Sequence, residues 1–399
     1  MTVASKLFLN RFINRVNILL IVAALVMTAT VAICQTADDY VRTGLIKSNA
    51  GDQDGAIADY TKAIGLKADD ASAYGNRGAA KEAKGDTDGA IADFTKTIEL
   101  TPKDPVAYYD RGIARDAKGD TDGAITDYDK ALELKPDYAD AFFNRGNAKS
   151  DKGDLDGAIT DYTKSISLKP DGADFYYNRG YAKRQKRDLD GAIADLSKAI
   201  ELNPSNAASF GTRGSAKRAN GDLNGAIADF TQAIVLDPKL AASYSSRGYA
   251  LYDSHSFSNA LADFRKAIEL ESTDDYTHFR VWLIRTRSGE EKPASAELKA
   301  YLDGRAAGKP DEWAPKVGRF LTGELAEAVF LAAAKNTDSK TEAGQSCEAY
   351  FYAGSKHLFA GDKATASDYF QRSVATNNKD YTEYDSATAE LKFLEANGK

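Results

Sequence analysis

Small and apolar residues recur along most of the chain at one constant interval. The glycines that mark the interval are Gly44, Gly78, Gly112, Gly146, Gly180, Gly214 and Gly248. In each copy an alanine and then an aromatic residue or leucine follow the glycine at fixed spacings, as Ala90 and Phe94 follow Gly78. The interval between successive glycines is 34 residues. A fixed period of this length indicates stacked supersecondary units, each of which needs its neighbours to bury its apolar face.

Each copy is predicted to form two antiparallel helices. In residues 71–104 a first helix ends at Gly85, and Asp86 is placed to cap the second helix through its carboxylate. The second helix carries apolar residues at helical spacing, including Ala90 and Phe94, which gives it one buried stripe. The small residues of each copy allow the two helices to approach closely, and the aromatic ring fills the space beside them.

The period divides the chain into segments. We predict seven repeats, at 37–70, 71–104, 105–138, 139–172, 173–206, 207–240 and 241–274. Beyond residue 274 the repeat period is lost, because Trp282 replaces the glycine and several prolines interrupt the chain. We therefore expect a degenerate helical region at 275–346, a weak further repeat at 347–380 and a polar-backed capping helix at 381–399.

These residues resemble the tetratricopeptide repeat (TPR) family. Its aromatic, glycine, alanine, aromatic and proline positions match Tyr74, Gly78, Ala90, Phe94 and Pro102, and the match extends over about residues 37–274. The resemblance implies an all-α fold, a right-handed TPR superhelix built as an α-solenoid of antiparallel helix pairs. A C-terminal helical extension and capping helix would follow it, and the first helix of each pair would line the concave face.

An arginine precedes most of the repeated glycines, and an aspartate precedes the aromatic residue of the second helix. We hypothesise that they form a ladder of partly buried, bidentate ion pairs that sets the register of the repeats. The ladder comprises Arg77, Arg111, Arg145, Arg179, Arg213 and Arg247 with Asp93, Asp127, Asp161, Asp195, Asp229 and Asp263. The alternative is that the aspartates form only surface pairs with lysines three residues on, such as Lys96.

The positions that vary between repeats are the candidates for binding. In TPR proteins the residues three and two before the glycine, and one and four after it, point into the concave groove. Here this rule selects Tyr109, Asp110, Ile113, Phe143, Asn144, Asn147, Tyr177, Asn178, Tyr181, Arg184 and Arg218. Aromatic rings beside carboxamides suit an extended peptide. The alternative is that the tyrosines only pack between neighbouring first helices.

One known mode of peptide capture does not fit. The carboxylate clamp of chaperone-binding TPR proteins needs lysines two residues into the first helices. Here those positions hold Ser72, Val106, Asp140 and Asp174, and the two aspartates would repel a carboxylate.

The beginning of the chain, at 1–34, differs from the rest. Basic residues up to Arg15 precede the mostly apolar stretch 18–34, which is the order of a secretory signal peptide. We expect export to the periplasm, with cleavage after Ala32 or Cys34. The alternative is an uncleaved anchor that associates with the inner membrane through residues 18–34. The net charge of -7 disfavours binding to nucleic acid.

No catalytic or metal-binding motif stands out, and we expect no enzyme activity, cofactor or metal. The aspartate-rich turns lack the ligand spacing of a calcium loop, so helix capping explains them better. His255 occupies a position that is glycine in most turns, and we predict a solvated turn residue. Cys347 has no candidate base nearby in sequence, and we predict a small core residue.

The C-terminal part resembles NlpI-type bacterial envelope lipoproteins. The resemblance rests on Trp313, on residues 320–323 and on residues 347–352 followed by Gly361 and Asp362. It implies a periplasmic adaptor that assembles envelope proteins, often as a homodimer. We therefore predict a non-catalytic scaffold that binds a protein or an extended peptide. The alternatives are a homo-oligomer whose groove holds its own tail, and an envelope enzyme with its chemistry in residues 275–346.

Overall fold

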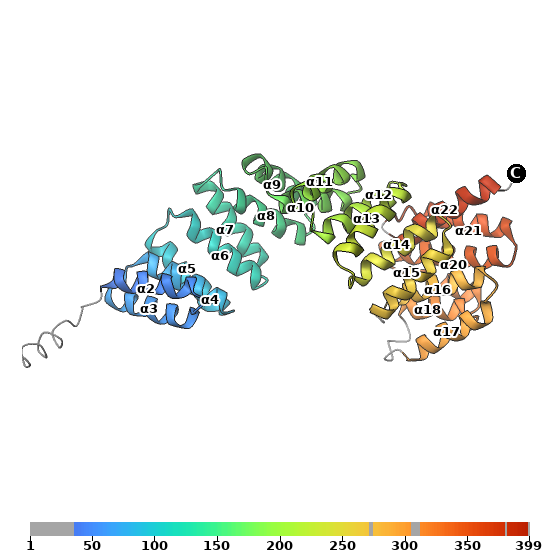
Figure 1. Cartoon of the computed structure of the whole chain (residues 1–399), viewed down its shortest axis with the longest axis horizontal. Helices are drawn as coiled ribbons and strands as arrows, with labels where there is room; N and C mark the ends of the chain where they lie inside the picture. Colours follow the sequence, from blue (N-terminus) through green and yellow to red (C-terminus); the bar gives the residue numbers. More distant parts are fainter. Residues whose placement is uncertain (1–35, 271–273, 305–311, 380, 398–399) are drawn as a thin grey trace, which may run out of the picture. The chain divides into compact units, whose positions relative to one another are not determined.

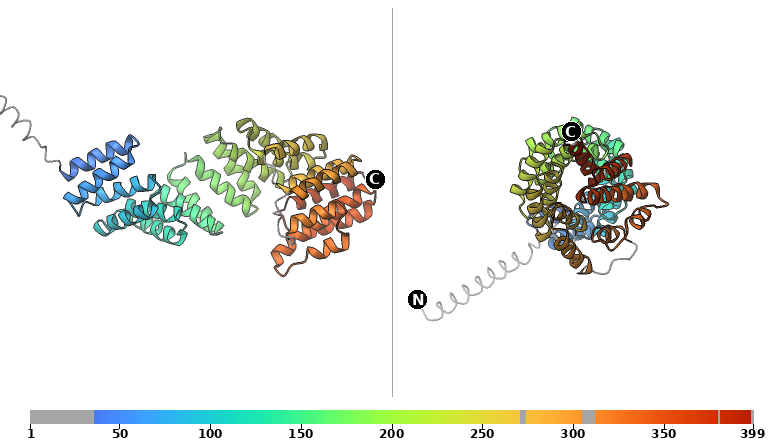
Figure 2. Two further views of the ribbon diagram at one scale, coloured as in Figure 1. Left: turned by 90° about the horizontal axis from the view of Figure 1, so that it is seen from below. Right: turned by 90° about the vertical axis from the view of Figure 1, so that its right-hand side faces the viewer.

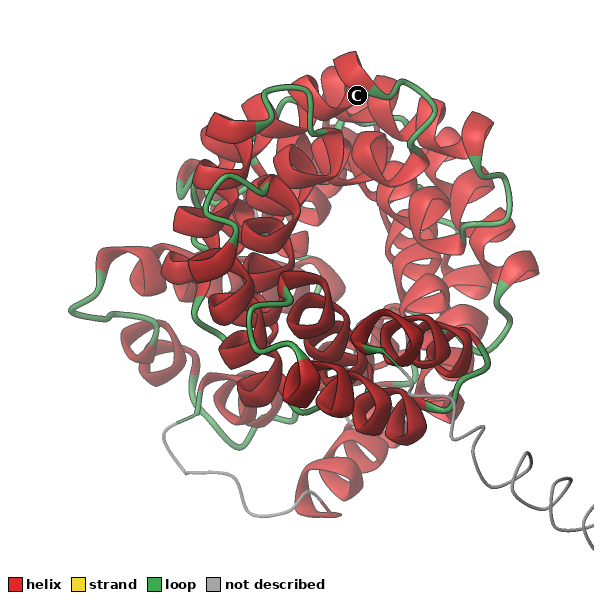
Figure 3. Ribbon diagram, turned by 90° about the vertical axis from the view of Figure 1, so that its left-hand side faces the viewer, coloured by secondary structure: helices red, strands yellow, loops and turns green. Residues whose placement is uncertain are grey.

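The computed structural model describes residues 36–270, 274–304, 312–379 and 381–397 (Figure 1). Within these ranges the chain forms helices and no strand (Figure 3). The predicted signal peptide or anchor at 1–34 lies outside the described residues. The chain divides into two compact units, one that ends at Gly153 and one that begins at Asp154.

The first unit consists of consecutive antiparallel helix pairs. Within this unit the first helix of each of the first three repeats packs on its own second helix and on the first helix of the next repeat. The helices are α2 (Ala37–Asn49), α3 (Gln53–Leu66), α4 (Ala71–Ala83), α5 (Thr87–Leu100), α6 (Pro105–Ala117), α7 (Thr121–Leu134) and α8 (Ala139–Asp151). The predicted all-α array of helix pairs is therefore confirmed.

The second unit continues the same arrangement and then departs from it. Its repeat helices are α9 (Leu155–Leu168), α10 (Ala173–Gln185), α11 (Leu189–Leu202), α12 (Ala207–Ala219), α13 (Leu223–Leu236), α14 (Ala241–Asp253) and α15 (Phe257–Leu270). The helices beyond the repeats are α16 (Asp275–Arg287), α17 (Glu291–Gly304), α18 (Trp313–Leu321), α19 (Glu327–Ala333), α20 (Ser339–Phe359), α21 (Lys363–Ala375) and α22 (Thr382–Asn397).

The repeated glycine and aromatic residue form one packing unit. A Cβ atom on Gly112 would lie 2.6 Å from the ring of Tyr128, and one on Gly78 would lie 2.8 Å from Phe94. Only glycine leaves room for the ring at this distance. The aromatic residues are almost fully buried, with Tyr128 1% and Phe230 1% exposed.

The turn within each repeat is set by a glycine and a capping aspartate. Gly85 has a φ of 82°, a backbone conformation that glycine adopts without strain. The carboxylate of Asp86 then accepts a hydrogen bond from the backbone N–H of Gly89, as predicted for a helix cap. A side chain at Gly89 would collide with that carboxylate.

Helix α22 does more than close the end of the array. It packs on α20 and α21 and also reaches back to α14 of the last regular repeat (Figure 2). The sequence predicted a polar-backed cap, but the inward face of α22 carries polar residues as well. Glu383, Ser386 and Glu390 are each at most 2% exposed.

Candidate functional site

Five of the predicted arginine–aspartate pairs are present and are bidentate. Arg111 donates from Nε and Nη2 to the two carboxylate oxygens of Asp127, at 2.9 and 2.7 Å. Asp127 is 2% exposed. The same two bonds join Arg77 to Asp93, Arg179 to Asp195, Arg213 to Asp229 and Arg247 to Asp263. The alternative partner Lys96 pairs with Glu99 instead.

The arginines also connect neighbouring repeats. The third guanidinium nitrogen of Arg77 donates to the hydroxyl of Thr61, and Arg213 donates to Ser197 in the same way. This hydroxyl recurs directly after the aromatic position, so the sequence contained the signal. The exceptions are Arg265 in the last repeat and Asp129, which forms an ion pair with Arg145. Asp161, the predicted partner of Arg145, belongs to the second unit.

Most aspartates of the ladder also contact a second cation. Lys81 lies 2.8 Å from the carboxylate of Asp93, and Arg115 lies 2.8 Å from that of Asp127. Lys183 and Lys217 repeat this contact with the aspartates of their own repeats. The sequence did not predict this second contact.

The groove candidates of the first unit are half-buried on its first helices. The hydroxyl of Tyr109 accepts a hydrogen bond from Asn144, and its ring centroid lies 4.7 Å from that of Tyr138. Tyr109 therefore packs between repeats, as the alternative interpretation held. Burial, followed by the charge of Asp104, raises the pKa of Asp110 to about 6. Ile113 packs in the same cluster, and Phe143 and Asn147 are half-buried on α8.

The groove candidates of the second unit begin on α10. Tyr181 is 39% exposed, and its ring stacks with that of Tyr177 at a centroid distance of 6.4 Å. The guanidinium of Arg184 lies 5.3 Å from the Tyr181 ring. Asn178 is half-buried on the same helix. This surface therefore combines a stacked aromatic pair with a neighbouring cation.

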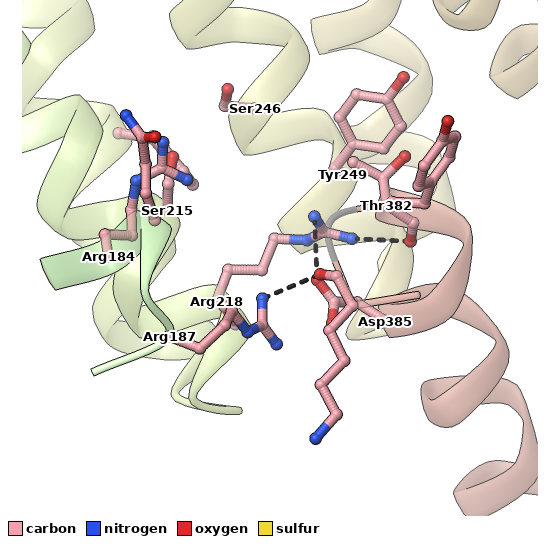
Figure 4. Close-up of a pocket in the computed structure, with 13 residues that line it drawn as sticks. Arg184, Arg187, Ser215, Arg218, Ser246, Tyr249, Thr382 and Asp385 are labelled. Atoms are coloured by element: carbon pink, nitrogen blue, oxygen red, sulfur yellow. Dashed lines mark hydrogen bonds and ion pairs between the residues drawn. The ribbon is translucent and has the colours of Figure 1, made fainter. Parts of the chain in front are cut away.

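Arg218 contacts the C-terminal segment of the chain, by which we mean residues 379 and 381–397. Its guanidinium lies 2.6 Å from Asp253 and 3.6 Å from Asp385, and it donates to the carbonyl oxygen of Thr382 (Figure 4). Its side chain is only 9% exposed. Although the sequence placed Arg218 in the groove, it forms part of the wall where α22 meets the repeats.

The prediction of a solvated turn at His255 is wrong. The His255 side chain is 18% exposed and lies 3.4 Å from the carboxylate of Glu390. Its ring stacks on Phe393 at 4.1 Å. His255 has a φ of 61°, a strained conformation for a residue with a side chain. Burial against α22 explains why this turn has lost its glycine.

Arg187 is the other turn residue among the seven repeats that is not glycine. It has a φ of 64°, and it donates to the carbonyl oxygen of Lys379 at 2.9 Å. The left-handed conformation costs a residue with a Cβ atom about 1 kcal/mol. Both strained turns therefore contact the C-terminal segment, and no period in the sequence predicted that contact.

A buried polar network holds α22 in place. Arg280 is fully buried and donates to Glu383 at 2.9 Å and to Ser386 at 3.1 Å. Glu383 also accepts a hydrogen bond from Tyr352. Glu348 lies in the same region and accepts a hydrogen bond from the indole N–H of Trp313 at 2.8 Å. The sequence did not predict this network.

Burial, followed by the negative charge of Glu383, raises the pKa of Glu348 to about 8. The unfolded chain has the ordinary pKa near 4.5. Between these values the folded state keeps a proton that the unfolded state has lost, so stability falls as pH rises. In the wild type the free energy of unfolding falls as pH rises, and we expect this fall to be smaller by on the order of 2 kcal/mol in Glu348→Gln. Urea unfolding at about pH 5 and about pH 8.5, followed by tryptophan fluorescence, measures it.

Glu395→Gln is the matched control, because Glu395 lies on the exposed side of α22. The control should keep the wild-type difference in stability between the two pH values. An unchanged difference in Glu348→Gln would contradict the assignment of the retained proton to Glu348.

The remaining candidates for chemistry are placed as structural residues. Cys347 is fully buried, and burial raises its pKa to about 11, which suppresses the reactive thiolate. His278 stacks on Tyr301, and His357 lies 3.1 Å from Glu327. In the part of the chain that the structure describes, no three metal-binding side chains cluster, and no helix has the length and hydropathy to cross a membrane.

The fold and this surface define the class of the protein, a helical repeat array that serves as a protein-interaction scaffold. Residues 42–105, 117–153, 146–187, 173–206 and 214–254 match the tetratricopeptide repeat. The chain belongs to the tetratricopeptide repeat family, whose members are generally non-catalytic.

Solved structures with similar chains include other repeat proteins. The chain is 30% identical to MamA, with 42% of this chain and 92% of MamA covered and a TM-score of 0.41. It is similar in fold to the C-terminal part of a TPR protein from Cytophaga hutchinsonii, at 18% identity, 60% and 98% coverage and a TM-score of 0.51. YrrB, described as a TPR protein with an unusual peptide-binding site, is 24% identical, with 46% and 95% coverage and a TM-score of 0.43.

Proposed function

We propose that the protein binds an extended peptide segment of a partner protein on the first-helix face of its repeats. The observation that carries this proposal is the Tyr181 ring, 39% exposed and stacked on Tyr177. An exposed aromatic ring on a rigid helix provides contact area at a low cost in conformational entropy. The neighbouring Asn178 can donate to and accept from a peptide backbone.

The proposal includes the cell envelope as the site of action. The order of basic and apolar residues in 1–34 supports export, and the resemblance of the C-terminal part to NlpI-type lipoproteins supports an adaptor role. The proposal includes a homodimer, and an uncleaved inner-membrane anchor is the alternative to cleavage and release into the periplasm. Mass spectrometry of the mature amino terminus distinguishes cleavage from anchoring, and light scattering measures the oligomeric state.

We expect Tyr181→Ala combined with Asn178→Ala to weaken peptide binding at least about tenfold, because the anchor ring and its polar neighbour are both lost. Random peptides displayed on phage are selected on the immobilised full chain. The affinity of a selected synthetic peptide is then measured by fluorescence anisotropy.

Val235→Ala is the control, because Val235 is 65% exposed on the second helix α13. It should bind the peptide within about twofold of the wild type. If selection enriches no peptide, or if the Tyr181 and Asn178 variant binds as the wild type does, the proposed function is wrong.

A further inference from the structure

A cavity of about 430 Å³ lies where α10, α12 and α14 meet the C-terminal segment (Figure 4). All of its lining residues belong to the second unit. Arg184, Arg187 and Arg218 approach from the repeats, and Thr382 and Asp385 approach from the C-terminal side. We call this cavity the basic pocket.

The described lining of the basic pocket has more positive than negative charge. Arg184, Arg187, Arg218 and Lys379 contribute four cations, whereas Asp385 is the one carboxylate among the described lining residues, and Asp380 lies outside the described residues. Asp253 lies behind Arg218 and, together with Asp385, neutralises that guanidinium. Asp385 also interacts with Arg187, so Arg184 and Lys379 are the cations that exceed the negative charge of the described lining.

Arg184 has an unsatisfied donor at this place. Its Nε atom is buried and has no hydrogen-bond partner among the described residues. A buried donor without a partner costs about 1–3 kcal/mol, so such a group usually indicates a ligand or water that completes it. The hydroxyl of Ser246 lines the same cavity, whereas the hydroxyls of Ser215 and Thr382 already donate to the carbonyl oxygen of Gly211 and to Glu383.

Arg187 adds a second independent observation. Its backbone holds a left-handed conformation that glycine adopts without strain in the neighbouring repeats, for example at Gly153 and Gly221. Its guanidinium donates to the carbonyl oxygen of Lys379, and its charge also acts on the carboxylate of Asp385. Backbone strain of this kind persists where a side chain has a role that offsets it.

We infer that the basic pocket binds a carboxylate of the partner peptide, supplied by an acidic side chain or by the end of the peptide chain. This inference rests on the proposed function. Arg184 connects the two regions, because its guanidinium lies over the exposed ring of Tyr181 and also lines the pocket. A peptide lying across Tyr181 therefore brings its next residues to the pocket.

The chemistry of the pocket selects a carboxylate over a neutral group. Guanidinium groups donate paired hydrogen bonds that match the two oxygens of a carboxylate. The pocket differs in position from the carboxylate clamp, whose lysine positions lie near the beginning of the first helices. Here the cations lie at the opposite end of α10 and beside α22.

The test is a parallel phage selection on the wild-type full chain and on the variant Arg184→Gln/Arg187→Gly. The glycine restores the unstrained turn, so this variant loses charge without added backbone strain. One library presents internal random sequences, and a second presents random sequences with a free C-terminus. Enrichment of aspartate or glutamate at one aligned position indicates a side-chain carboxylate, and enrichment in the second library alone indicates a chain end.

We expect wild-type selections to show the acidic preference and the variant selections to lose it. Replacing the selected glutamate by glutamine, or the free terminus by an amide, should weaken wild-type binding about tenfold and variant binding less than about twofold. Lys186→Gln is the matched control and should keep the preference, because Lys186 lies beside these residues in sequence but pairs with Asp156.

The outcomes separate the two proposals. Peptides enriched without an acidic preference, yet weakened by the Tyr181 and Asn178 variant, would overturn the basic pocket and leave the proposed function standing. Equal acidic preference in wild type and variant would also overturn the basic pocket. No enrichment in any selection would overturn both. Arg187→Gly alone should retain the wild-type fold and show a partial loss of the preference.

Discussion

Glu383→Ala is expected to lower the free energy of unfolding of the C-terminal helices by about 3–5 kcal/mol, because it leaves a buried cation without its counter-ion. Arg280 is 0% exposed, and Glu383 is the carboxylate that pairs with it. The substitution also removes the acceptor for the hydroxyl of Tyr352. Both effects weaken the attachment of α22 to α16 and α20.

Tryptophan fluorescence during urea unfolding measures this effect selectively. The chain has two tryptophans, Trp282 and Trp313, and both lie among these helices. Glu395→Ala, on the exposed side of α22, should change stability by less than about 0.5 kcal/mol. A Glu383→Ala transition that coincides with that of the control would show that the Arg280 pair contributes nothing to stability.

Asp127→Asn is expected to cost the first unit about 3 kcal/mol, since it removes the charge that balances two arginines. Asp127 is 2% exposed and contacts both Arg111 and Arg115. The side chains of these arginines are 13% and 26% exposed, so water replaces the lost partner only in part. The loss should be concentrated in α6 and α7, which this carboxylate joins.

Hydrogen-exchange mass spectrometry of peptides from α6 and α7 reads this loss locally. Asp122→Asn on the same helix is the control, because the Asp122 side chain is 82% exposed and forms a surface ion pair with Lys152. It should change protection by less than about 0.5 kcal/mol. Equal protection in the two variants would show that the arginine–aspartate pairs contribute no more to stability than exposed ion pairs do.

The periodic features of the fold were predictable from the sequence. The contact between Gly112 and Tyr128 depends on a spacing that recurs in every copy, and the pair between Arg111 and Asp127 depends on one that recurs in six of the seven copies. Repetition makes such spacings visible, because chance does not reproduce them so often. The helix pairs and the buried aromatic residues follow from the same repeats.

The contacts of the C-terminal segment were not predictable in this way. Arg280 and Glu383 are separated by 103 residues, and their contact occurs once. The one available signal was a residue other than glycine in the turns at Arg187 and His255. The residue at His255 was interpreted as solvated, and Arg187 was given no interpretation. The groove candidates lie on first helices, but their packing against neighbours, as at Tyr109 and Arg218, depends on the three-dimensional structure.

The return of α22 to α14 has a consequence for the number of repeats. An open array of identical units can gain or lose a unit wherever two units meet, because each unit contacts only its neighbours. The contacts of the C-terminal segment with Arg187, Arg218 and His255 fix the spacing of three successive repeats. A unit inserted between α10 and α14 would separate these partners, whereas one inserted between α3 and α4 would leave them in place. The array can therefore be lengthened near its beginning but has a fixed length near its end.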